Sequence, residues 1–245
     1  MAKLISLENE EKVYEYASNI IIDAIKNFTP TKEKPYLVLG LPTGSTPIGV
    51  YKKIIKAYKN NEISFDNVVT FNMDEYVGLD DNHPQSYHYF MYDNFFKHID
   101  INLSHVHILD GMAQNLEKEC QEYENKINSY GGIDIQLGGI GQNAHIAFNE
   151  PGTSFSSVTH IQDLTQNTIE ANSRFFNNIT EVPTKALTIG LKTIYDAKMV
   201  LILALGNKKK DAIRCSTSKE PSTNCPASIL QSHSNAYFIC DKEAC

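Results

Sequence analysis

A short polar segment, residues 138–151, carries an imidazole and a carboxylate that could do acid–base chemistry, His145 and Glu150. It directly follows the strand-like run 133–137. An imidazole and a carboxylate on one loop can move protons near neutral pH. Pro151 prevents a long helix from continuing through the segment, and open α/β sheets bind ligands at the carboxyl ends of their strands. We interpret the segment as a candidate catalytic loop; a glycine-rich turn with a chance His and Glu is the alternative.

A second candidate segment joins the apolar run 36–41 to a predicted helix that extends from residue 48 to about residue 60. Backbone N–H groups, a helix dipole and hydroxyl donors meet at such a turn and can bind an anion. The turn is not a Walker A loop, because it has no Gly-Lys-Ser/Thr. An ordinary strand–helix turn is the alternative. The residues of the turn are Thr43, Gly44, Ser45 and Thr46.

Charged residues follow two further predicted strands. Asp74 and Glu75 come after the strand 68–71. Because neighbouring side chains of an extended chain point in opposite directions, we expect one carboxylate to face the ligand and the other the scaffold or solvent. A solvated acidic loop is the alternative. The lysines at 208–210 come after the strongly apolar strand 199–205, where phosphate contact and a solvated charge cluster are equally compatible with the composition.

Strands and helices alternate along the rest of the chain. Apolar residues at three- and four-residue spacing predict a helix over residues 7–28, with Ser6 as its N-cap. Residues 215–225 are predicted to form a loop. The alternation predicts a doubly wound, mostly parallel, Rossmann-like sheet with helices on both faces. We expect one domain over residues 1–245, with a mobile flap around 152–185. The other predicted strands are 106–109, 186–189 and 236–240, and the other predicted helices are 87–96, 115–130, 165–176 and 226–233.

Composition excludes several classes of partner. The chain has 245 residues, 42% of them hydrophobic, and a net charge of −7, which argues against nucleic acid or an anionic membrane surface as the main partner. The longest apolar run, 199–205, is too short to span a bilayer. The cysteines are odd in number and widely spaced, without a CxxC pair, so neither a zinc site nor a disulfide framework is indicated. We therefore expect a reduced, cytoplasmic, soluble protein. Its cysteines are Cys120, Cys215, Cys225, Cys240 and Cys245.

Four ordered segments resemble the glucosamine-6-phosphate deaminase family: 39–47, 70–79, 145–151 and 171–176. The resemblance runs from the N-terminus to about residue 210 and resumes at residue 226. It implies a doubly wound α/β fold and the conversion of glucosamine 6-phosphate and water to fructose 6-phosphate and ammonia, in amino-sugar catabolism. It implies no redox cofactor and no metal. The partner would be a sugar phosphate, and the family includes both monomers and hexamers.

The resemblance also assigns roles to individual residues. Asp74 would take the sugar proton from C2 and return it at C1. His145, with Glu150 nearby, would move a proton between the ring oxygen and O1 during ring opening. Arg174 and Lys209 would clamp the phosphate, because two fixed cations suit a dianion. The rest of the phosphate site would be the turn of Thr43, Gly44, Ser45 and Thr46.

The chain departs from the family pattern at several positions. Asn143 stands where many members have an aspartate that supports the histidine; its carbonyl oxygen can accept the imidazole N–H but cannot stabilise an imidazolium by charge. Ala144 replaces a glycine, which matters if this position requires a positive φ. We expect no activation by N-acetylglucosamine 6-phosphate, because uncharged or weakly basic residues stand where allosteric members have basic ones. These residues are Val158, His160 and Gln162.

Three other functions are weighed against this resemblance. The pattern Gly139-x-Gly141-x-x-Ala144 formally matches the dinucleotide-binding fingerprint, but Pro151 interrupts the helix that NAD binding needs. The related 6-phosphogluconolactonase family shares the fold and the phosphate turn but should lack the segment that contains Asp74. A sugar-phosphate-binding module that has lost catalysis is compatible with an asparagine at position 143, although the retained acid–base residues argue against it.

Overall fold

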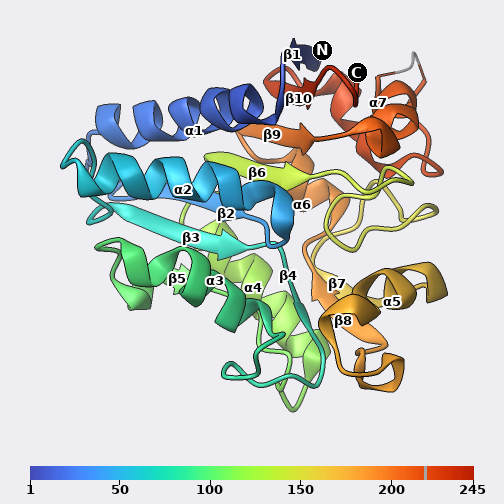
Figure 1. Ribbon diagram of the computed structural model, residues 1–245. Helices are drawn as coiled ribbons and strands as arrows, with labels where there is room; N and C mark the ends of the chain where they lie inside the picture. The colour runs from blue at the N-terminus through green and yellow to red at the C-terminus, as the bar shows by residue number, and fades with distance from the viewer. Residues whose placement is uncertain (218–219) are drawn as a thin grey trace.

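The computed structural model of the protein describes residues 1–217 and 220–245. Its main sheet has seven strands in the order β1-β10-β9-β6-β2-β3-β5 (Figure 1), and every pairing within it is parallel. The predicted mostly parallel sheet is therefore confirmed. The strands are β1 (Lys3–Leu7), β2 (Leu37–Leu41), β3 (Val68–Asn72), β5 (Val106–His107), β6 (Ile135–Gly139), β9 (Met199–Ala204) and β10 (Ala236–Asp241).

Helices cover both faces of the main sheet, as predicted (Figure 1). One hydrophobic core joins Leu39 of β2 to Ile21 and Val50 from the helices α1 and α2. The other core joins the preceding β2 residue, Val38, to Ile127 of α4. Successive residues of β2 are thus buried on opposite faces, which explains why the strand reads as a continuous apolar run. The first core contains α1 (Glu10–Asn27), α2 (Ser45–Lys59) and α3 (Tyr87–Asn94), and the second contains α4 (Leu116–Ser129), α6 (Leu191–Tyr195) and α7 (Lys210–Ser216).

A second, three-stranded sheet lies outside the sequence-based expectations. In it β4 (Asp74–Tyr76) and β7 (His160–Asp163) both pair antiparallel with β8 (Lys185–Thr188). Only Met73 separates β3 of the main sheet from β4. The Met73 N–H donates to the Leu41 carbonyl of the main sheet (3.1 Å), and its carbonyl accepts from the Ile189 N–H (2.8 Å). The chain passes from one sheet to the other at the residue before Asp74.

The N-terminal helix begins later than predicted. Asn9, not Ser6, is its N-cap, and the Asn9 side chain accepts from the N–H of Lys12 (3.1 Å). Ser6 instead lies in β1 beside Cys240 of β10. The sequence did not indicate β1 because this edge strand has no buried residue and so lacks a strong apolar pattern. The start of the helix was therefore predicted too early.

Two predicted helices are partly or wholly 3₁₀. The predicted helix 165–176 is α5 (Gln166–Asn172) followed by η3 (Ser173–Phe175), and the predicted helix 226–233 is η6 (Pro226–Ser232). Among the residues that the structure describes, no helix is both long and apolar enough to cross a membrane. The mobility of the flap stays a prediction. The remaining short helices are η1 (Phe96–His98), η2 (Leu103–His105), η4 (Ile179–Glu181) and η5 (Asn207–Lys209).

Four of the five cysteines form disulfides, so the expectation of a fully reduced chain is wrong. Cys215 at the end of α7 is bonded to Cys225, and Cys240 of β10 to Cys245. The paired Cα atoms lie 6.3 and 6.0 Å apart, within the range that a disulfide can bridge. Spacing along the chain did not reveal these pairs because they depend on how the chain folds back. Cys120 is buried and unpaired.

Candidate active site

The candidate residues gather where the strand order of the main sheet reverses. From β2 the chain continues to β3 and β5 on one side, and from β6 it continues to β9 and β10 on the other. Because β2 and β6 are parallel neighbours, the phosphate turn after β2 and the loop after β6 begin at the same edge. Strand β9, the other neighbour of β6, leads to Lys209. Ligands of open parallel sheets bind at such a switch point.

Glu150 is the centre of a hydrogen-bond network on the loop after β6. Its Oε2 accepts from the Asn143 side-chain amide (2.7 Å), and its Oε1 accepts from the Thr168 hydroxyl (2.8 Å). The His145 Nδ1 atom lies 3.7 Å from Oε1. Burial alone would raise the pKa of Glu150, but the imidazole and the two hydrogen bonds outweigh it and lower this pKa to about 2. Glu150 is therefore an ionised partner for the imidazole.

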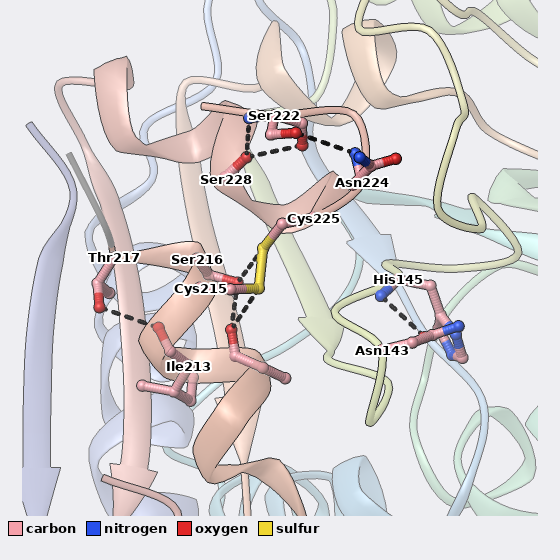
Figure 2. The surroundings of a disulfide bond; sticks show 11 residues. Asn143, His145, Ile213, Cys215, Ser216, Thr217, Ser222, Asn224, Cys225 and Ser228 are labelled. Carbon is pink, nitrogen blue, oxygen red and sulfur yellow. Dashed lines mark hydrogen bonds between the residues drawn. A yellow bond between two sulfur atoms is a disulfide. The ribbon is translucent and has the colours of Figure 1, made fainter. Parts of the chain in front are cut away.

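Asn143 does not contact the imidazole in the way that the sequence suggested. Its carbonyl oxygen accepts from the backbone N–H of His145 (3.3 Å; Figure 2), while its amide nitrogen binds Glu150. The hydrogen bond from the imidazole to Asn143 that the sequence allowed does not form, and the ring nitrogen Nδ1 lies near Glu150 Oε1 instead. Gly141 makes room for this ring, because a Cβ there would lie 2.3 Å from ring atoms of His145.

The backbone of this loop adopts conformations that non-glycine residues disfavour. Ala144 has φ 64° and Ala147 has φ 54°, at a cost of about 1–2 kcal/mol each. The replacement of the family glycine by Ala144 therefore does place a side chain at a positive φ. Asn149, which is fully buried, holds the loop by donating from its side chain to the carbonyls of Ile146 (2.9 Å) and Ile189 (2.8 Å).

Asp74 is the first residue of β4 and lies opposite Thr188 of β8. Its side chain is 7% exposed. Burial, followed by the charge of the neighbouring Glu75, raises its pKa to about 8. A carboxylate of this basicity suits the role of a base that takes a proton and then returns it.

Glu75 is completely buried, so the solvated acidic loop is the wrong interpretation. Its carboxylate accepts from the backbone N–H groups of Tyr87 and His88 in the first turn of α3. The prediction that one of the two adjacent carboxylates faces the scaffold is confirmed, and that one is Glu75.

The phosphate turn is open at its backbone. Gly44 is the N-cap of α2 with φ 100°, and no side chain caps this helix. Gly44 and Ser45 are exposed, whereas Thr43 and Thr46 are partly buried. The first N–H groups of α2 are therefore available to an anion.

The two predicted phosphate clamps differ in their surroundings. Lys209 lies in η5 and is partly buried, while Lys208 and Lys210 are exposed. Burial lowers the pKa of Lys209, which sets it apart from the other lysines of the triplet. Arg174 lies in η3 and is exposed; η3 directly follows α5, the helix whose Thr168 binds Glu150. The phosphate-binding roles of Arg174 and Lys209 stay predictions.

Residues on either side of Cys225, which is bonded to Cys215 (Figure 2), contact the candidate catalytic loop and the residue that follows it. The Gly152 N–H donates to the Thr223 carbonyl (2.8 Å), and the Ala227 N–H donates to the Ala144 carbonyl (3.0 Å). Thr223, in the part of the chain where the family resemblance lapses, thus binds the residue just beyond the loop that carries His145. Ala227, where the resemblance has resumed, binds the loop itself.

Sequence reasoning missed one residue of the Glu150 network. Thr168 lies in α5, 18 residues beyond Glu150, and its pattern indicated only a position in a predicted helix. The dinucleotide-binding fingerprint was one alternative that the sequence left open.

That fingerprint requires a helix that begins within it. No described helix begins within residues 140–151, so this requirement is not met. Across residues 1–217 and 220–245, no three His, Cys, Asp or Glu side chains gather in a way that could hold a metal ion.

Comparison with known proteins places the whole chain in one family. The model of the family described as glucosamine-6-phosphate isomerases/6-phosphogluconolactonase matches residues 8–239. A glucosamine-6-phosphate deaminase of Borrelia garinii subsp. bavariensis is 52% identical over 99% of this chain and 90% of that protein. The solved structure of a monomeric glucosamine-6-phosphate deaminase has a TM-score of 0.92 and 45% identity, over 99% of this chain and 98% of that one.

A more distant likeness concerns the fold alone. The 6-phosphogluconolactonase of Trypanosoma brucei has a TM-score of 0.77 at 18% identity, over 100% of this chain and 97% of that one. The family model and the deaminase relatives cover nearly the full length of the chain at a much higher identity. The protein belongs to the glucosamine-6-phosphate isomerase/6-phosphogluconolactonase family.

Proposed function

We propose that the protein is a glucosamine-6-phosphate deaminase, which converts glucosamine 6-phosphate and water to fructose 6-phosphate and ammonia. The relatives that are 52% and 45% identical over nearly the full chain carry this activity in their names. The observation that carries the proposal is the buried carboxyl of Asp74, which follows the residue bonded to Leu41 at the end of β2 and whose pKa is raised to about 8. A base of this strength is what proton transfer between two sugar carbons requires.

The reaction divides between the two sides of the switch point. The sugar phosphate binds with its phosphate at the N-terminus of α2, where Gly44 leaves the N–H groups open. His145, held beside the ionised Glu150, moves a proton from the O1 hydroxyl to the ring oxygen and so opens the ring. Asp74 takes the C2 proton to form an enolamine and returns it to C1. Water then adds at C2, and ammonia leaves.

A lactonase is the weaker candidate because the solved structures described as 6-phosphogluconolactonases share the fold at 17–21% identity. A binding module without catalysis would keep the phosphate turn and lose turnover. Both alternatives are separated from the deaminase by one assay.

The test is the release of ammonia and fructose 6-phosphate from glucosamine 6-phosphate, with Asp74→Asn as the control variant. We expect equal amounts of both products, and a loss of about 10²–10⁴-fold in kcat in the variant. A thermal shift with the sugar phosphate but no product would instead support a binding module. Hydrolysis of 6-phosphogluconolactone without ammonia release would support the lactonase.

We further infer a cytoplasmic monomer. The 45% identical neighbour is described as monomeric, and phosphorylated sugars are kept inside cells. Light scattering of the purified protein should give the mass of one chain, and a hexamer would contradict this.

His160 contacts the Val158 carbonyl (2.7 Å) and Gln162 (3.3 Å), and these residues offer little charge to an activator's phosphate. Saturation curves should therefore be the same with and without N-acetylglucosamine 6-phosphate.

A further inference from the structure

Glu75 is a completely buried carboxylate to which the proposed reaction gives no part. Its Oε1 accepts from the backbone N–H groups of Tyr76 (2.7 Å) and Tyr87 (2.9 Å). Its Oε2 accepts from the backbone N–H of His88 (2.9 Å) and lies 2.9 Å from the His88 Nδ1 atom. A carboxylate that accepts this many hydrogen bonds fixes the backbone around it.

These hydrogen bonds join two separate elements. Tyr76 lies in β4, whereas Tyr87 and His88 are the first two residues of α3. The N-terminus of a helix attracts anions, and here a carboxylate from the neighbouring strand binds at it. Ser86 caps the same helix by accepting from the Tyr89 N–H (3.1 Å). The start of α3 is thus bound to the strand that carries Asp74.

The other edge of β4 is held by strand pairing. Asp74 and Tyr76 pair with Thr188 and Ala186 of β8, so β4 is fixed by β8 on one side and by Glu75 towards α3. We propose that Glu75 is a positioning residue for Asp74: by joining β4 to the first turn of α3, it fixes the base relative to the bound sugar. This inference rests on the proposed deaminase activity, because it concerns the base of that reaction.

The same network reaches the phosphate turn. The ring of Tyr87, whose N–H binds Glu75, lies against the ring of Tyr76 with the centroids 4.9 Å apart and the planes tilted by 52°, and its hydroxyl interacts with Thr43. Glu75 therefore connects the strand of the base to the segment proposed to hold the phosphate. The distance between the base and the phosphate decides whether C2 of the sugar lies within reach of Asp74.

Glu75 also acts on Asp74 through its charge. The other ionisable groups that sense the charge of Asp74 are phenols from α2, β4, α3 and α4, and burial raises their pKa values so far that they stay neutral at physiological pH. Glu75 is the neighbour whose negative charge adds to burial in raising the pKa of Asp74. The phenols are Tyr51, Tyr76, Tyr87 and Tyr123.

The test is the variant Glu75→Gln, which removes the charge and turns one acceptor into a donor facing backbone N–H groups. We expect kcat to fall about 10–100-fold while KM changes less than about threefold, because the base is displaced and the phosphate site is retained. We also expect the rise of kcat/KM with pH to move to lower pH, because Asp74 loses a charged neighbour.

A control variant removes an exposed carboxylate that also accepts from a backbone N–H, near the opposite end of β3. Asp100 accepts from the Phe65 N–H (2.8 Å) and the Ser64 hydroxyl (2.7 Å), just before β3 begins. Asp100→Asn should lower the melting temperature and leave kcat and its pH dependence unchanged. If Glu75→Gln behaves in the same way, with only the melting temperature lowered, the positioning role is overturned.

A second variant serves if Glu75→Gln does not fold. His88→Ala removes one donor to Glu75 and keeps the three backbone donors. It should lower kcat about 3–10-fold with little change in KM, in line with the loss of one hydrogen bond of ordinary strength. Unchanged kcat in a folded His88→Ala variant would overturn the proposal. Wild-type protein without turnover of glucosamine 6-phosphate would overturn the proposed function instead, so the two failures are distinguishable.

Discussion

Asp74 and Glu150 are both buried carboxylates proposed to act on one sugar, yet their surroundings shift their pKa values in opposite directions. Asp74 lies in a short strand, where burial and Glu75 raise its pKa to about 8. Glu150 lies on a loop, where His145, Thr168 and Asn143 lower its pKa to about 2. The comparison shows that local donors, not residue type, divide the work: one carboxyl group can exchange a proton and the other stays ionised.

The two regions also differ in backbone. Asp74 is held by regular pairing with β8, whereas Glu150 ends a loop with two alanines at positive φ. The loop needs hydrogen bonds from outside itself, from Thr168 and from the segment around Thr223. The strand is joined to α3 through the hydrogen bonds of Glu75 and the ring contact between Tyr76 and Tyr87.

Of the changes that test this comparison, removing the charge of Glu150 should have the largest effect on turnover. In Glu150→Gln the imidazole loses its ionised partner and the loop loses a charged acceptor for two donors. We expect kcat to fall about 10²-fold, as for the loss of an acid–base group. The measurement is ammonia release under saturating substrate.

The control for this variant is Glu170→Gln, which changes an exposed carboxylate on α5 that pairs with Gln166 (3.1 Å). It should retain full activity. A Glu150→Gln enzyme as active as this control would show that the imidazole works without its carboxylate.

The pH dependence of stability should separate the two carboxylates. The folded-state pKa of Asp74 is raised above the ordinary value of 3.8, so its contribution to the free energy of unfolding is present below pH 4 and is lost as pH rises through about 8. Asp74→Asn, which imitates the protonated form, should therefore be more stable than wild type at pH 8–9 by about 2–4 kcal/mol. At pH 4 the two proteins should be equally stable.

Glu150 should show the opposite sign. Its pKa is depressed, so its contribution is present above the ordinary value of 4.5 and is lost as pH falls towards 2. Denaturant melts between pH 2 and pH 9 measure both effects. A stability difference for Asp74→Asn that does not change with pH would contradict the raised pKa.

The smallest effect should come from substitutions that remove the cost of a positive φ in the loop, and it should be an effect on stability. Ala144→Gly removes the cost of a positive φ but also removes a buried methyl group, so we expect a change within about 1 kcal/mol. Ala147, at a similar φ, is only partly buried, so Ala147→Gly should stabilise more. Thermal melts of the two variants test this order, and the reverse order would mean that packing matters more at position 147.

The main sheet and much of the site were predictable because their signals are local. Strands β2, β3, β6 and β9 are apolar runs, and the polar loops after them follow at once. Strand β8 was predicted as residues 186–189. Strand β1, the other two strands of the small sheet and the pairing of that sheet were not predictable, because edge strands and very short strands form only through tertiary pairing. Both disulfides likewise depend on chain reversal that spacing does not encode.

Within the site, the types of the residues were predictable but their contacts were not. The sequence placed Asn143 beside the imidazole, whereas the structure joins its amide to Glu150. Thr168 was missed because a hydroxyl on a distant helix has no sequence signal that connects it to the loop. The opposite roles of Asp74 and Glu75 followed from strand alternation, but which of them is buried against α3 required the structure.

Met73 links the packing of the small sheet to the location of Asp74, the proposed base. Its N–H is bonded within the main sheet and its carbonyl to Ile189, just beyond β8. A change in the packing of β7 or β8 must therefore displace Asp74 relative to β2 and the turn that follows it. Substitutions in the small sheet, far from any sugar atom, give evolution or a protein engineer a means to adjust turnover while the residues that touch the substrate stay the same.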